Sequence, residues 1–218
     1  MSALRPTPVR PRVRALDAGL AAGPLFLVVW AAQAFTRSGF EPDRHPLSLL
    51  ALGALGWIQI ANFVVTGTLL IAAGAGLWRT LGPGRSVGWG SALIAGFGVG
   101  MIVAGVFVTD PGAGFPAGAP AGAPERFTWH GALHEIGFVV ASLCWTAAAV
   151  LFLVRFLRRR RWVASAATAV TFSAVLTLAA WPDLDGLSVR LVVATALQFA
   201  FVAALTVDAR QFARYPSA

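Results

Sequence analysis

The chain has 218 residues and a formal net charge of +8, with 57% of its residues in the hydrophobic set and only 12% charged. Soluble domains are about half apolar and about a quarter charged, so this composition excludes a water-soluble domain and predicts an all-α membrane protein. It also argues against a nucleic-acid-binding protein, because the arginines lie in short segments between apolar runs and do not form a basic face on a soluble fold.

Six apolar runs are long enough to cross a bilayer, whose hydrocarbon core of ~30 Å needs about 20 helical residues. In chain order they cover about residues 18–35, 57–78, 87–108, 128–154, 162–181 and 191–207. We therefore predict a polytopic bundle of six transmembrane helices over residues 16–209, preceded by a basic tail at 1–15 and followed by a short tail at 210–218.

The first run has an alternative interpretation. A basic start, an apolar stretch and the small-residue pattern Ala32-Gln33-Ala34 are together typical of a signal peptide and its cleavage site. Cleavage would leave five helices. We favour a retained helix, because the run is long enough to span and its small residues suit helix packing.

A short apolar segment at residues 46–54 precedes the second run. One helix from Pro46 to Trp78 would be ~50 Å long, well beyond the thickness of a bilayer. A break is therefore expected, and Gly53 and Gly56 offer the place for it. We predict a separate short helix at 46–54 that lies at the membrane interface.

The arginines are distributed unevenly among the connecting segments. Placing the N-terminus in the cytoplasm assigns most of them to that side, including the run Arg158 to Arg161, and leaves few outside. The outer ones are Arg37, Arg44, Arg126 and Arg190. Because short cytoplasmic loops are enriched in basic residues, this asymmetry predicts that both chain ends are cytoplasmic.

With this topology, all three histidines fall at the outer boundary together with Asp110. His130 and His134 are four residues apart and therefore share one face of the fourth helix. Imidazole and carboxylate are normal zinc ligands, and three of them plus water form a catalytic centre. We hypothesise that Asp110, His130 and His134 hold a divalent metal such as zinc, with His45 as a fourth ligand or general base and Glu135 as another proton carrier. The interpretation that we favour is the structural one, in which these side chains bond one another and cap helix ends, and proton or haem chemistry is a third alternative.

Two amide side chains, Gln59 and Asn62, lie one turn apart near the outer end of the second helix. An unpaired amide in hydrocarbon is costly, so both must face the bundle. They are expected to hydrogen-bond between helices, or to form, with Ser48, the floor of a polar cavity beneath the histidines.

Several segments resemble the bacterial integral membrane family catalogued as domain of unknown function 998. They are His45-Pro46-Leu47-Ser48, Gly56-Trp57-Ile58-Gln59-Ile60-Ala61-Asn62-Phe63, Gly105-Val106-Phe107-Val108-Thr109-Asp110-Pro111 and Trp129-His130-Gly131-Ala132-Leu133-His134. The resemblance covers most of the chain. It implies a six-helix protein of the bacterial inner membrane in which these polar positions belong to the family pattern, and it implies no activity.

A looser similarity links the chain to the membrane hydrolase superfamily that includes alkaline ceramidases. Those sites combine a serine, an aspartate and three histidines, and Ser48, Asp110, His45, His130 and His134 are the same residue types. That superfamily has seven helices, however, and its paired histidines lie near the end of the chain. The likeness is therefore an analogy of residue types only.

Two functions remain in competition. The first is an accessory or small-molecule-binding membrane component whose outer polar cluster is structural. The second is a metal-dependent hydrolase that acts on a lipid-like substrate at the outer leaflet. A proton-coupled carrier is disfavoured, because the second to fifth helices have no ionisable residue near mid-membrane. The expected surroundings are the lipid bilayer, and no pattern indicates a protein partner.

Overall fold

The computed structural model describes residues 10–82, 84–124, 126–182 and 186–214. Within these ranges the protein is all-helical. It consists of α1 (Arg10–Thr36), a 3-10 helix η1 (Leu47–Ala51), α2 (Gly56–Leu81), α3 (Arg85–Val106), α4 (Trp129–Arg158), α5 (Trp162–Ala180) and α6 (Leu187–Arg214). Each of the six α-helices contains a stretch long and apolar enough to cross a membrane, which confirms the predicted fold class.

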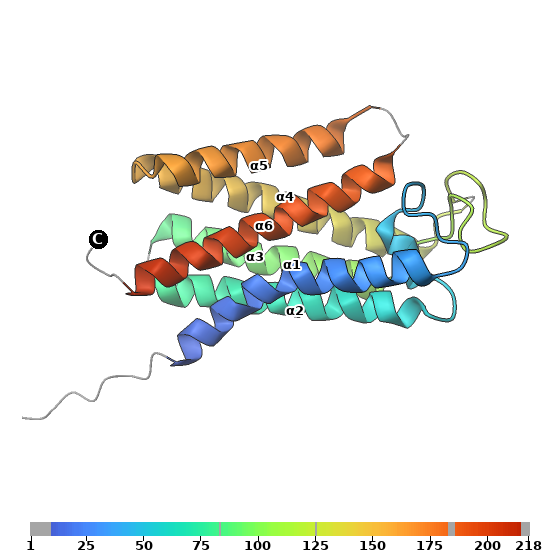
Figure 1. The fold of residues 1–218 in the computed structure, drawn as a ribbon, viewed down its shortest axis with the longest axis horizontal. Coiled ribbons are helices and arrows are strands. Elements are labelled where there is room, and N and C mark those ends of the chain that lie inside the picture. The colour runs from blue at the N-terminus through green and yellow to red at the C-terminus, as the bar shows by residue number, and fades with distance from the viewer. Residues whose placement is uncertain (1–9, 83, 125, 183–185, 215–218) are drawn as a thin grey trace, which may run out of the picture.

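The six α-helices run side by side, and their connections fall at two ends of the bundle (Figure 1). The long segments 37–55 and 107–128 lie together at one end, called here the loop end. The other end, called the arginine end, carries the short connections α2–α3 and α4–α5, the start of α1 and the end of α6. There Arg210 of α6 pairs with Asp17 of α1, and Arg161 pairs with Asp208 of α6.

Helical structure extends into both predicted tails, because α1 begins at Arg10 and α6 continues to Arg214. The ion pair between Asp17 and Arg210 joins α1 to α6 beside these two extensions. Arginine side chains are long enough to reach an interface from a helix end, so a helix can continue beyond the apolar run that defines its span. The remaining tail residues, 1–9 and 215–218, lie outside the described part of the chain.

The expected break before α2 is present, and the short helix η1 occupies the middle of the segment predicted at 46–54. Gly53 has φ +74°, a conformation that glycine adopts without strain. A Cβ on Gly56 would lie 2.0 Å from the carbonyl oxygen of Ala51, so only glycine fits the start of α2. Arg37 fixes the segment by donating to the carbonyls of Leu50 and Leu52. Burial lowers the pKa of the Arg37 guanidinium from its usual value.

Glycines bring α2, α3 and α4 into backbone contact. A Cβ on Gly67 of α2 would lie 2.5 Å from the carbonyl oxygen of Gly98 in α3. A Cβ on Gly100 of α3 would lie 2.5 Å from the backbone nitrogen of Ala141 in α4. Small residues permit this approach between membrane helices, where lipid is as apolar as the side chains and packing must supply the attraction. The three helices therefore pack closely against one another.

Candidate functional site

The carboxylate of Asp110 ties the segment after α3 to the start of α4. Thr128, the N-cap of α4, donates its backbone N–H to Asp110 Oδ2 at 2.8 Å and its hydroxyl to Oδ1 at 2.6 Å. The first N–H groups of a helix have no partner within the helix, and a negative charge is favourable beside them. Gly131 makes this possible, because a Cβ there would lie 2.0 Å from Asp110 Oδ2.

His130 continues this chain of hydrogen bonds to the surface. Its Nδ1 lies 3.0 Å from Thr128 Oγ1, which also accepts from the backbone N–H of Gly131 at 3.1 Å. Since the Thr128 hydroxyl donates its only hydrogen to Asp110, His130 Nδ1 must be the donor in the third bond. In the neutral ring, Nε2 then carries the lone pair. The His130 side chain is exposed and packs against the ring of Trp129, with centroids 4.3 Å apart.

His134 is buried one turn further along α4 and faces the end of α3. Its Nδ1 lies 2.7 Å from the carbonyl oxygen of Ala104 and 3.2 Å from that of Phe107. Both partners are acceptors, so Nδ1 carries the proton and caps carbonyls that the helix itself leaves unpaired. His134 therefore holds α4 against the C-terminal end of α3.

His45 joins the two long segments of the loop end. Its Nδ1 accepts from the backbone N–H of Glu41 at 2.8 Å, and its Nε2 lies 3.0 Å from the carbonyl oxygen of Ala113. The ring is buried and packs between Phe40 and Phe115. Because both ring nitrogens are engaged, His45 has no lone pair left for a metal or for a proton from a substrate.

The structure therefore separates the predicted ligands. Among the described residues, no three His, Cys, Asp or Glu side chains come together in a way that could hold a metal ion. Asp110 and His130 meet only through Thr128, whereas His134 and His45 each bond carbonyls elsewhere. Glu135, predicted as a proton carrier, is exposed on α4 next to the buried His134.

The amide side chains of α2, Gln59 and Asn62, form a hydrogen-bond network with neighbouring helices. Gln33 of α1 donates to Gln59 Oε1 at 2.8 Å, and Asn62 donates to the carbonyl oxygen of Phe26 in α1 at 3.1 Å. Gln59 also reaches the carbonyl of Leu47 in η1 at 3.4 Å, while Ser48 of η1 is half-buried. The arrangement matches the expected hydrogen bonding between helices. Three buried atoms here lack partners in the described part of the chain: Gln33 Oε1, Asn62 Oδ1 and Thr66 Oγ1.

Three important residues were not singled out from the sequence. Thr128 could have been found as an N-cap, since threonine is a preferred residue directly before a helix. Gln33 was read only as part of a cleavage-site pattern, although a polar residue in an apolar run usually needs a partner. Gly131 offers no signal without the position of Asp110, because its importance depends on a contact between two segments distant in sequence.

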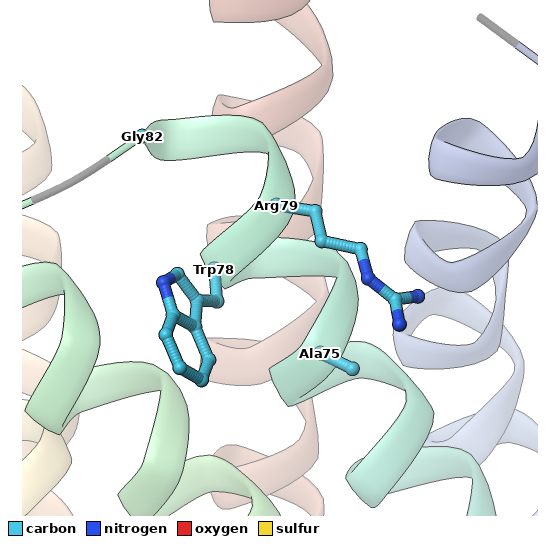
Figure 2. Close-up of a pocket in the computed structure, with 4 residues that line it drawn as sticks. All are labelled: Ala75, Trp78, Arg79 and Gly82. Carbon is cyan, nitrogen blue, oxygen red and sulfur yellow. The ribbon is translucent and has the colours of Figure 1, made fainter. Parts of the chain in front are cut away.

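Two hollows of the protein lie away from the histidines. One, of about 540 Å³, is an open depression around the end of α2, lined by Ala75, Trp78, Arg79 and Gly82. Figure 2 shows Trp78 and Arg79 extending to opposite sides of this helix. The other, of about 370 Å³, lies between α5 and α6. None of the three histidines lines either hollow.

Comparison with known proteins places the chain in a family. No curated protein and no solved structure matches it. A family model described as a protein of unknown function, DUF998, matches residues 20–208, a range that includes most of each apolar span and all the histidine and amide residues described above. The chain is a member of the DUF998 family, as its motifs indicated.

Proposed function

We propose that this protein is a non-enzymatic membrane component that binds an amphipathic small molecule at its loop end, with His130 as the group that receives the ligand. The observation that carries the proposal is the hydrogen-bonded chain from Asp110 through Thr128 to His130. It fixes the exposed imidazole in one tautomer. In that tautomer the lone pair is on Nε2, which takes part in none of the hydrogen bonds described above.

The surroundings of His130 suit a ligand with an apolar body and a hydrogen-bond-donating head. The neighbouring side chains of Phe127 and Trp129 are 70% and 67% exposed, so they offer aromatic area beside the imidazole. Exposed aromatic rings at a membrane interface bind molecules that are apolar at one end and polar at the other. A hydroxyl or amino group of such a molecule would donate to His130 Nε2.

The hydrolase alternative is less well supported by the same residues. It requires several metal ligands and a base around one point, yet Asp110, His134 and His45 are each engaged with groups of the protein itself. These three side chains connect α3, α4 and the long segments, which is the role expected of a structural polar layer.

Native mass spectrometry of the protein purified with a total membrane lipid extract tests the proposal. His130→Phe keeps an aromatic ring but removes the nitrogens, whereas Glu135→Gln changes an exposed neighbour and serves as control. We expect a co-purifying small molecule on the wild type and on Glu135→Gln, and its loss from His130→Phe. Equal occupancy in all three would contradict the proposal. Lipid cleavage products formed by the wild type alone would favour the hydrolase.

We further propose that the arginine end faces the cytoplasm of a bacterial cell, so that the loop end lies at the outer face of the inner membrane. The arginines of the α4–α5 connection and Arg79 support this orientation, because basic residues are enriched in cytoplasmic loops. Fusion of alkaline phosphatase after Arg161 and, separately, after Gly118 tests it. Phosphatase activity is expected only from the second fusion, and the reverse result would invert the topology.

A further inference from the structure

A groove between α5 and α6 lies away from the loop end and has no part in the function proposed above. It has a volume of about 370 Å³, within the range of small-molecule sites. Its walls are mostly apolar and come from three helices. Lining residues include Phe156 of α4, Ala164 and Ala167 of α5, and Ala204, Asp208 and Gln211 of α6.

The groove becomes polar where it reaches the arginine end. Asp208 is paired with Arg161, whose guanidinium also lies 5.5 Å from the centre of the Phe156 ring. This pair neutralises the acidic residue of the groove. The adjacent residues Arg158, Arg159 and Arg160 are all exposed, so the groove ends beside a strongly positive surface.

We propose that this groove binds one acyl chain of an anionic phospholipid, whose phosphate is held by Arg158, Arg159 and Arg160. The apolar walls match the chain, and the arginines match the charge of the head group. Arginine binds phosphate with several N–H groups at once, and basic clusters next to a transmembrane helix attract anionic lipids. The ion pair of Asp208 keeps its carboxylate from repelling the phosphate.

Native mass spectrometry of the full chain, reconstituted with equal amounts of phosphatidylglycerol and phosphatidylcholine of matched acyl chains, tests the head-group part. We expect the wild type to retain phosphatidylglycerol in preference to phosphatidylcholine. Arg159→Gln is expected to lower this preference roughly fivefold, the effect of one basic residue near a membrane surface. Arg126→Gln, which removes an exposed arginine near the start of α4 at the opposite end, is the matched control and should leave it unchanged. Equal retention of the two lipids by the wild type would overturn the proposal.

The acyl-chain part is tested by filling the groove. Ala167→Trp places a large side chain in it, whereas Ala166→Trp adds the same side chain at the neighbouring exposed position of α5 that does not line the groove. Loss of bound phosphatidylglycerol from Ala167→Trp alone is expected, with both variants eluting as folded protein in gel filtration. Equal retention by the two variants would overturn the proposal. So would a change of oligomeric state in Ala167→Trp alone, since a second copy would then be the occupant.

This proposal is independent of the one for the loop end. His130→Phe should retain phosphatidylglycerol like the wild type, because His130 lies at the opposite end of α4 from Arg158. Failure at one end therefore leaves the other proposal standing.

Discussion

The helices α2, α3 and α4 pack closely against one another, whereas α5 packs loosely, and the distribution of glycine explains the difference. Half of the residues in the apolar windows of α2 and α3 are buried, against 17% in that of α5. Neither α5 nor α6 contains a glycine. In contrast, α2, α3 and α4 meet at glycines, and the backbone of the adjacent helix occupies the space that a side chain would fill. In lipid, where no hydrophobic force draws helices together, side-chain size sets how closely two helices approach.

The polar groups follow the same division. In the closely packed half, formed by α2, α3 and α4, Asp110 accepts a hydrogen bond at the start of α4 and His134 bonds a carbonyl at the end of α3. On the other side, α5 and α6 leave a groove whose polar end faces the arginines. The closely packed helices keep one arrangement, whereas the groove between α5 and α6 leaves the space for the acyl chain that we propose.

The largest expected effect comes from breaking the glycine contact between α3 and α4. A Cβ on Gly100 would lie 2.5 Å from the nitrogen of Ala141 and 2.7 Å from the oxygen of Gly137, so the helices must separate. Overpacking of a core typically costs about 1–3 kcal/mol, and a clash with backbone should reach the upper end. Gly100→Leu should therefore lower the thermal unfolding temperature in detergent markedly.

Gly88→Leu is the matched control on the same helix, because a Cβ on Gly88 would meet no atom within 4 Å outside its own stretch of helix. It should leave the unfolding temperature unchanged or raise it slightly, since leucine favours the helix more than glycine does. If both variants melted at the same temperature, glycine packing would not explain the closeness of α3 and α4.

The contact between Gly131 and Asp110 should have the next largest effect. Gly131→Ala places a Cβ 2.0 Å from the carboxylate and should destabilise the protein by about 2 kcal/mol, in the middle of the range for overpacking. In an Asp110→Ala background the same substitution meets no carboxylate and should cost little. A double-mutant cycle in chemical denaturation measures the difference, and additive effects would show that the two residues are not coupled.

The carboxylate itself should contribute slightly less. In Asp110→Asn the side chain keeps its shape, but its amide nitrogen meets a donor of Thr128 and one hydrogen bond to a charged group is lost. We expect a loss of about 1.5–2 kcal/mol of unfolding free energy, within the range for charged hydrogen bonds. Asp43→Asn, an exposed aspartate at the same end, should change stability by less than about 0.5 kcal/mol. Equal effects of the two substitutions would mean that Asp110 is not a structural residue.

Much of the fold could be predicted from the sequence, because hydropathy alone marks six runs and the pair Gly53 and Gly56 marks the break before α2. The gathering of the histidines at one end also follows from topology. The individual hydrogen-bond partners of these side chains could not be predicted. The path of residues 107–128 has no periodicity, so nothing in the sequence indicates that Ala113 meets His45 or that Thr128 stands between Asp110 and His130. Spacing placed two imidazoles on one helix face, but their partners depend on this irregular segment.

The smallest expected effect is at Asn62, which we compare with Thr66, a second buried polar residue on the same face of α2. Asn62 donates to the carbonyl of Phe26 and to Gln59, so Asn62→Leu should cost about 0.6 kcal/mol, the average for hydrogen bonds between membrane helices. Thr66 lies one turn deeper, and its hydroxyl has no partner in the described part of the chain. Thr66→Val keeps the shape and removes an unsatisfied group, so it should be neutral or stabilising. The free energy of unfolding of both variants is measured in the same detergent. If Thr66→Val lost as much stability as Asn62→Leu, the Thr66 hydroxyl would have a partner, such as a buried water, in the closely packed half of the bundle.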